Sequence, residues 1–243
     1  MKQQQSLARA TAAGFSLLEL MIVVVLVLIV TGAVFNVINL STARSATEQT
    51  KLDMFQEARE FMDQMSRDLR QAGYPNPRNV DQTVLTQDPI KNDSHAAVGL
   101  VKIDDGDLWF EGDVDGSGTI SVVKYHLDNT GNNCPCLKRS QLPKIDGDPL
   151  AGQTTPTYQI EVQGVLNTNI FQAYNSAASV SLPVDITTND ITMASIDTVQ
   201  ATLTLHAANI DPQTHLKPVT TLVTTVRMNN CSQAAIGFQT SCQ

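Results

Sequence analysis

Apolar and polar residues are distributed unevenly along this chain of 243 residues. In residues 14–40 the only charged side chain is Glu19, and the positions between Phe15 and Phe35 are mostly apolar. Roughly 20 apolar residues in a helix, at about 1.5 Å per residue, cover the hydrocarbon core of a bilayer. Residues 15–40 are therefore predicted to form a transmembrane half of a helix.

The following segment has apolar residues at steps of three and four, which is typical of one buried face of a helix. These residues are Leu52, Phe55, Ala58, Met62, Met65, Leu69 and Ala72. Gly73 and Pro75 are expected to end the helix. Residues 41–74 are thus predicted to be an amphipathic half that continues the transmembrane half, and Gly32, inside the transmembrane half, is the one obvious weak point for a bend. A free-standing coiled coil is the alternative, but the stripe lasts barely three heptads.

Beyond Pro75 the chain changes to short β-favouring runs separated by turn residues, and residues 75–243 are expected to form one β-rich globular domain. Strands are predicted at residues 98–103, 108–110, 120–127, 158–165, 199–205 and 220–228. Residues 166–194 show no clear pattern, and we interpret them as an insertion or loop. Antiparallel strands packed on one long helix predict an α+β fold.

The composition argues against two classes of function, nucleic-acid binding through a broad basic surface and enzymatic catalysis. The formal net charge is −8 and the pI is near 4.8, which argues against a broad surface for nucleic acid, although a local basic patch stays open. The four histidines fall in no nucleophile or metal signature, and no Gly-rich phosphate loop precedes a helix. We expect no enzymatic activity, and a catalytic dyad assembled by the fold is the open alternative.

The first fourteen residues, MKQQQSLARATAAG, contain Lys2 and Arg9 and no acid. Positive charge on the short N-terminal side predicts a cytoplasmic N-terminus and a C-terminal domain beyond the membrane. The small residues precede the apolar run instead of following it, which disfavours cleavage after that run. Glu19 costs on the order of 3 kcal/mol in a membrane helix and is a functional candidate. The alternative is that headgroups solvate it at interface depth.

Residues 14–20, GFSLLEL, resemble the prepilin motif of type IV pilins and type II secretion pseudopilins. The resemblance implies a leader at residues 1–14, cleavage by prepilin peptidase after Gly14, and N-methylation of Phe15. It also implies that Glu19 neutralises the N-terminal ammonium of a neighbouring subunit during assembly. The chain departs from many major pilins in having no proline before Pro75.

Residues 56–59 and 67–74 are similar to the helix end of PilW-type minor pilins and J-type pseudopilins, and the order of elements in the globular part resembles the pilin fold. The resemblance implies a structural subunit involved in type IV pilus assembly or priming. A pseudopilin of type II secretion is one alternative, and a displayed adhesion or DNA-uptake module is another. The implied partners are prepilin peptidase, other minor and major pilins, the inner-membrane assembly platform, and membrane lipid before assembly. The implied location is the bacterial inner membrane with a periplasmic C-terminal domain, and then the pilus or pseudopilus.

The four cysteines are Cys134, Cys136, Cys231 and Cys242, an even set with no histidine at metal-ligand spacing. Disulfides in an oxidising compartment are the better interpretation and zinc the poorer one. A bond between Cys231 and Cys242 would contribute about 3 kcal/mol by loop closure, and the resemblance to pilins with a C-terminal disulfide loop agrees with it. Cys134 and Cys136 are expected to pair with each other or with the tail, and the sequence does not choose.

Residues 113–120, DVDGSGTI, fit the first eight positions of a calcium loop, with oxygen side chains at Asp113, Asp115 and Ser117. The twelfth position is Lys124, where a bidentate Glu belongs. A strand-connecting turn uses the same residues, so the sequence favours a turn. No cofactor is expected, and calcium is the weaker alternative.

Overall fold

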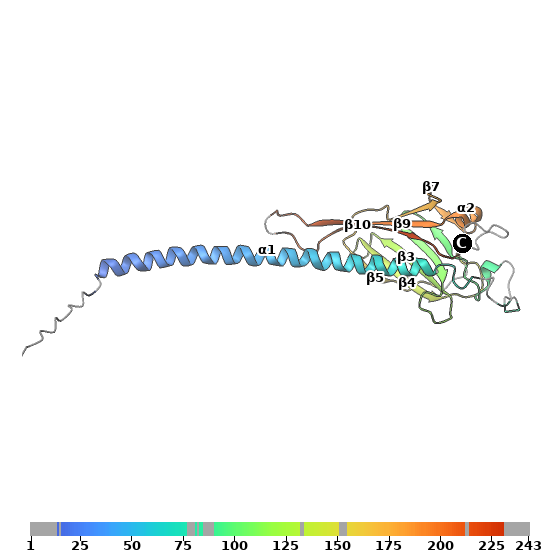
Figure 1. The fold of residues 1–243 in the computed structure, drawn as a ribbon, viewed down its shortest axis with the longest axis horizontal. Helices are drawn as coiled ribbons and strands as arrows, with labels where there is room; N and C mark the ends of the chain where they lie inside the picture. The colour runs from blue at the N-terminus through green and yellow to red at the C-terminus, as the bar shows by residue number, and fades with distance from the viewer. Residues whose placement is uncertain are drawn as a thin grey trace, which may run out of the picture. The chain divides into compact units, whose positions relative to one another are not determined.

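The computed structural model describes residues 14, 16–76, 81, 83–84, 90–131, 134–150, 155–211 and 214–230. Internal contacts divide the chain into two units, residues 1–47 and 48–243. One helix, α1 (Leu17–Gln71), runs without interruption across that division, and two antiparallel sheets follow it in the second unit (Figure 1). The predicted α+β fold, with a long N-terminal helix and antiparallel β structure, is confirmed.

Helix α1 has 55 residues and passes through Gly32 without a break. It ends where the sequence predicted, because Gly73 has a positive φ of 78° and its N–H donates to the carbonyl of Glu111 at 2.8 Å. Gly112 lies against the same end, since a Cβ added there would overlap the carbonyl oxygen of Gln71. The helix end is therefore in close backbone contact with the sheet.

The larger sheet has six strands in the order β5-β4-β3-β2-β1-β8, and every neighbouring pair is antiparallel. Its strands are β1 (Leu100–Ile103), β2 (Asp107–Gly112), β3 (Ser121–Asp128), β4 (Cys136–Pro143), β5 (Gln159–Gln163) and β8 (Val184–Asp185).

The smaller sheet has four strands in the order β10-β9-β6-β7, again antiparallel. Its strands are β6 (Phe171–Asn175), β7 (Ala178–Val180), β9 (Thr198–His206) and β10 (Val219–Arg227). A short 3-10 helix, η2 (Ile90–Asn92), precedes β1, and a short helix, α2 (Asp190–Ser195), lies between β8 and β9 in the chain.

Each of the six predicted strands overlaps a strand of the structure, namely β1, β2, β3, β5, β9 and β10. The interpretation of residues 166–194 as an insertion or loop is wrong. That stretch contains β6, β7, β8 and most of α2, and Phe171 and Ala173 are buried because β6 pairs with β9 in the smaller sheet. These strands have two to five residues each, too few to show a period of two in the sequence.

The second half of α1 buries one face in the core that it shares with the strands. Ala58, Met65 and Leu69 have no exposed surface, and the Phe61 ring meets the Tyr125 ring edge-on with 5.6 Å between centroids. Leu52 and Phe55, which belong to the predicted stripe, remain 54% and 43% exposed. The stripe is thus buried from Ala58 onward and open before it.

Candidate functional site

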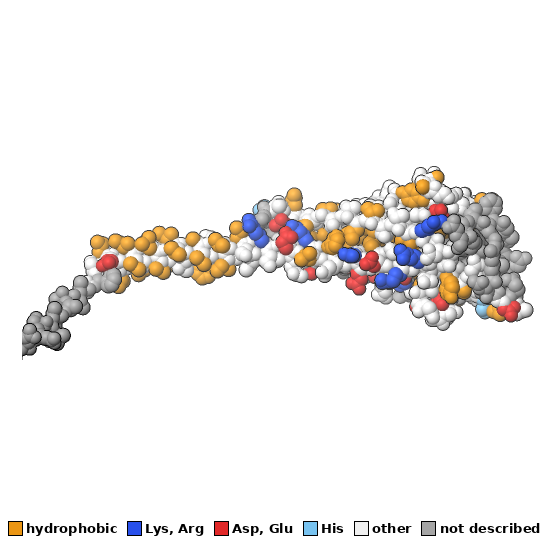
Figure 2. Space-filling view, viewed as in Figure 1, with side chains coloured by type: hydrophobic (Ala, Val, Ile, Leu, Met, Phe, Trp, Pro, Cys, Tyr) orange, Lys and Arg blue, Asp and Glu red, His pale blue; other side chains and the backbone are white. Residues whose placement is uncertain are grey.

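The N-terminal part of α1 exposes apolar side chains on every side. Its large apolar residues from Leu17 to Leu40 are between 46% and 79% exposed within the structure. The helix is long and apolar enough to cross a membrane, and the most apolar window of 18 residues has a mean hydropathy of 2.9. Figure 2 shows hydrophobic side chains covering this stretch of the helix. Lipid or other protein must cover such a surface in water, because so much exposed apolar area is unfavourable.

Glu19 lies in the first turn of α1 and is exposed, between Leu18 and Leu20. A carboxylate in the first helical turn interacts favourably with the positive end of the helix dipole. Gly14 lies ahead of the helix and outside any regular element, and the carbonyl of Ser16 accepts the N–H of Leu20 at 3.1 Å. Phe15, the predicted site of methylation, lies outside the described residues. The arrangement presents one acid at the start of an apolar rod, which suits the binding of a cationic group in a nonpolar setting.

A polar cluster joins the second half of α1 to the larger sheet. The Asp68 carboxylate accepts hydrogen bonds from Tyr125 Oη at 2.8 Å and from Arg139 Nε at 2.9 Å, and Arg139 Nη2 lies 2.8 Å away. Burial, together with the negative charge of Asp68, raises the pKa of Tyr125 well above its ordinary value. The phenol therefore stays protonated and donates. The predicted stripe does not include Asp68; the signal in the sequence was its spacing of three from Met65.

A second buried ion pair holds the loop that precedes β1. Lys144 Nζ lies 2.7 Å from Glu111 Oε2, and neither side chain is exposed. The same ammonium donates to the carbonyls of Lys91 and Ala96, at 3.0 and 2.7 Å. Burial raises the pKa of Glu111, while Lys144 opposes that change. The pair was not found in the sequence, because the two residues are 33 positions apart in segments with no shared pattern.

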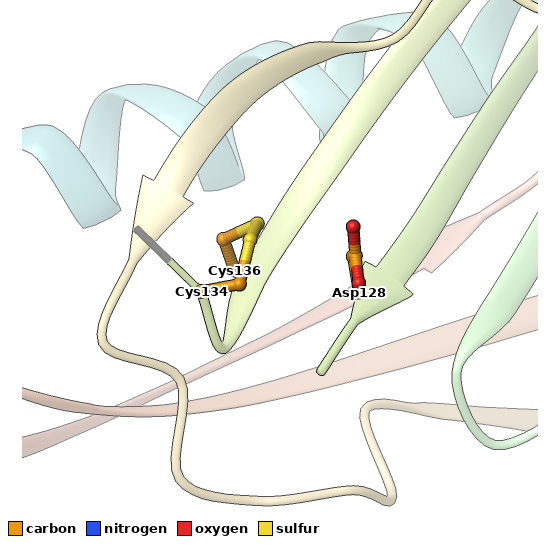
Figure 3. Close-up of side chains that lie close together, drawn as sticks. All are labelled: Asp128, Cys134 and Cys136. Atoms are coloured by element: carbon orange, nitrogen blue, oxygen red, sulfur yellow. A yellow bond between two sulfur atoms is a disulfide. The ribbon is translucent and has the colours of Figure 1, made fainter. Parts of the chain in front are cut away.

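The structure joins Cys134 to Cys136 by a disulfide, with 4.3 Å between their Cα atoms, at the turn into β4 (Figure 3). Asp128 lies beside it, and its carboxylate receives Lys138 Nζ at 2.6 Å. The ammonium of Lys138 and the N–H groups of Thr130 and Gly131 hold the pKa of Asp128 well below its ordinary value. Cys231 and Cys242 lie outside the described residues.

The ligand atoms of Asp128, Cys134 and Cys136 lie within 4.8 Å of one another, close enough in principle to surround a metal ion. With both sulfur atoms in a disulfide, neither is a thiolate that could ligate metal. The three residues are therefore best described as a disulfide beside a surface ion pair.

Asp113, Asp115 and Ser117 lie together in the loop between β2 and β3. Gly116 and Gly118 have positive φ values of 70° and 81°, as a tight turn requires. Lys124, at the twelfth position, is directed away from the loop, since its Nζ lies 3.9 Å from the centre of the Trp109 ring. The structure thus brings the predicted turn residues together, whereas Lys124, at position twelve, lies apart from them.

In a comparison with known protein families, one region of the chain matches a family model. Residues 9–35 match the family model described as the prokaryotic N-terminal methylation motif. The matched residues include Gly14, Phe15 and Glu19, and they cover the start of α1. No curated protein and no solved structure matches the chain.

The motif indicates a type IV pilin-like or pseudopilin-like precursor that prepilin peptidase processes. An apolar helix at the N-terminus fits the membrane anchoring that such a precursor needs. The matched region spans a small part of the chain, so the role of the globular unit is a separate question.

Proposed function

We propose that this chain is a minor pilin, a structural subunit that helps to prime or assemble a type IV pilus. The observation that carries the proposal is the position of Glu19, the one acid in the first turn of an exposed apolar helix, within the matched methylation motif. The similarity of residues 56–59 and 67–74 to the helix end of PilW-type minor pilins and J-type pseudopilins is compatible with this subtype and with the pseudopilin alternative.

The proposed sequence of events begins with the precursor in the inner membrane, with its N-terminus cytoplasmic and its C-terminal domain periplasmic. Prepilin peptidase cleaves after Gly14 and methylates Phe15. The carboxylate of Glu19 then neutralises the terminal ammonium of an adjacent subunit, an interaction that is strong at low dielectric. The exposed apolar surface of α1 exchanges lipid for the helices of other minor and major pilins, at the assembly platform.

The role is structural and needs no bound cofactor. The Asp68–Arg139 cluster and the Glu111–Lys144 pair support it, because they hold the second half of α1 and the loop before β1 to the larger sheet. A subunit that is pulled by its helix needs such a connection between helix and sheet. Disulfides at Cys134–Cys136 and, as proposed, at Cys231–Cys242 fit the oxidising periplasm.

Two measurements test the proposal. N-terminal sequencing of the mature protein from membranes is expected to begin at an N-methylated Phe15, and Gly14→Ala is expected to block processing. A mature protein that starts beyond residue 40 would contradict it. Deletion in the native host is expected to remove surface pili or twitching. Secreted enzymes retained in the periplasm would instead indicate a pseudopilin, and normal filaments with lost adhesion or DNA uptake would indicate a display module.

A further inference from the structure

The loop between β2 and β3 turns three oxygen-bearing side chains toward its own backbone. Gly118 N–H donates to Asp113 Oδ2 at 3.0 Å, and Ser117 N–H donates to Asp115 Oδ1 at 3.0 Å. Thr119 N–H donates to Ser117 Oγ at 3.2 Å. Each side chain thus uses one oxygen site to shape the loop and keeps another oxygen or lone pair free for a further partner.

Asp113 is the unusual member of this loop. Asp113 is only 6% exposed. Within the part of the chain that the structure describes, its Oδ1 atom has no hydrogen-bond partner. The bond from Gly118 to Oδ2 directs the carboxylate across the loop, toward a residue five positions later. A buried carboxylate oxygen without a donor or a cation is unfavourable, which points to a missing positively charged partner.

The neighbouring carboxylate, that of Asp115, is exposed to solvent and can supply a second negatively charged ligand. Its Oδ2 atom has one long contact, 3.4 Å from Gln141 Nε2. Among the described residues, neither carboxylate takes part in an ion pair. Two adjacent carboxylates repel each other, and a divalent cation between them would remove that repulsion.

We propose that the loop from Asp113 to Thr119 binds one calcium ion. The ligands are the free oxygens of Asp113 and Asp115, the hydroxyl of Ser117 and the backbone carbonyl of Thr119. They occupy the first, third, fifth and seventh positions of a calcium loop, with Gly118 at the sixth. An all-oxygen set with irregular geometry suits calcium better than magnesium, which demands a strict octahedron.

The residue at position twelve sets the strength of binding. Lys124 lies over the Trp109 ring and supplies no carboxylate, so water completes the coordination shell. A loop without the bidentate Glu is expected to bind with a Kd of about 10⁻⁴ to 10⁻³ M, the range of extracellular calcium modules. Such a site fills outside the cytoplasm and stays empty inside it.

The position of the loop gives the ion a structural consequence. Asp113 N–H donates to the carbonyl of Tyr74 at 2.8 Å, directly after the end of α1. The same residue therefore ligates the ion and holds the helix end. Calcium is expected to stabilise the connection between α1 and the β2–β3 hairpin.

Calcium binding by the full-length protein in detergent tests the proposal, measured by titration calorimetry and by the shift in the thermal midpoint. The wild type is expected to bind one ion and to melt at a higher temperature in about 5 mM calcium. Asp113→Asn and Asp115→Asn are expected to weaken binding at least about tenfold, since each removes one charged ligand. Asn keeps an acceptor for the backbone N–H, so the loop itself is retained.

Asp105→Asn is the matched control, because Asp105 is an exposed acid in the Asp-Gly turn between β1 and β2, where Lys102 neutralises Asp104 at 3.0 Å. It removes the same charge and is expected to leave binding unchanged. Ser117→Ala, which removes a ligand without altering charge, is expected to weaken binding as well. The proposal is overturned by a wild type that binds no calcium at about 10 mM, by equal affinity for magnesium, or by Asp113→Asn binding as the control does.

Discussion

One carboxylate oxygen of Asp68 in α1 contacts two nitrogens of Arg139 in β4. Asp68 Oδ2 lies 2.9 Å from Arg139 Nε and 2.8 Å from Arg139 Nη2. The side chains are 8% and 13% exposed. Asp68→Asn would leave the guanidinium without its counter-charge in a partly buried position. We expect the free energy of unfolding to fall by about 3 kcal/mol, measured by denaturant titration of the protein in detergent.

The Arg59–Asp63 pair on the same helix provides the matched control. Its atoms are 4.0 Å apart, and its side chains are 69% and 65% exposed. Asp63→Asn is expected to change the free energy of unfolding by less than about 1 kcal/mol, as is usual for solvated pairs. Equal effects of the two substitutions would show that the Asp68 cluster does not hold the helix to the sheet.

Gly112→Ala tests the contact between β2 and the helix end. The added Cβ would overlap the carbonyl oxygen of Gln71, a backbone atom that cannot turn aside as a side chain can. We expect a loss of about 2 kcal/mol or more in the free energy of unfolding. Gly106→Ala is the control, because its Cβ would meet Leu127 Cβ at an ordinary 3.4 Å. Thermal melts in which the two variants are alike would contradict this prediction.

The pH dependence of stability has a testable contribution from Asp185. Burial disfavours its ionised form, but hydrogen bonds from Thr187 and Thr188 outweigh burial and lower the pKa of Asp185 from 3.8 to about 2. A depressed folded-state pKa adds stability above the unfolded-state value, and that stability is lost as pH falls from about 4 to about 2. Asp185→Asn should remove this part of the pH dependence.

The size of the Asp185 effect is expected to be on the order of 1 kcal/mol, since solvent screens a group near the surface. Denaturant titrations at several pH values, for the wild type and Asp185→Asn, measure the difference. The two curves should be separated by a constant amount above about pH 4 and should converge as the pH falls from about 4 toward 2. Curves that stay parallel through this window would disprove the assignment.

Glu19→Gln is expected to separate insertion from assembly. The amide removes the charge and keeps the shape, so the protein should still enter the membrane and lose its leader. Incorporation into filaments should fall about tenfold or more, because losing an interaction of about 1.4 kcal/mol already costs a factor of ten. Immunoblots of membrane and sheared-filament fractions measure it. Glu60→Gln, an exposed acid on the same helix, should behave as the wild type does.

Disulfide mapping tests the cysteine pairing. A non-reduced digest should contain a peptide in which Cys134 and Cys136 are joined, as in the structure. Cys231 and Cys242 are then expected to be joined to each other, and the bond should add about 3 kcal/mol by loop closure. A peptide that links Cys134 or Cys136 to the tail would contradict both assignments.

The sequence predicted best those elements whose burial repeats regularly. Along β9, buried and partly exposed residues alternate at every position, and the sequence TVQATLTLH shows that alternation directly, since Val, Ala and Leu alternate with Thr, Gln and His. The second half of α1 is equally regular from Ala58 onward. The apolar segment and Glu19 were visible because a lone charge in a long apolar run has few structural explanations.

The elements that the sequence did not predict are stabilised by residues that lie far away in sequence. Strand β4 reads CLKRSQLP, with little β propensity, and it forms because it is paired on both sides, by β3 and β5. Phe171 and Ala173 flank the exposed Gln172, but two apolar residues are too few to predict a strand, and pairing with β9 holds them in register. Asp68–Arg139 and Glu111–Lys144 join residues far apart in sequence, and only folding brings them together.

The last turn of α1 receives its cap from the far end of the chain, since Asn230 Nδ2 donates to the carbonyls of Arg70 and Ala72 at 3.2 and 3.1 Å. A ribosome makes the helix long before it makes Asn230. The carbonyls of Arg70 and Ala72 therefore lack this partner, and water solvates them, until almost the entire polypeptide has been synthesised. Completing this cap couples closure of the domain to the arrival of its final strand, so a nascent subunit cut short before Asn230 would leave the helix end uncapped.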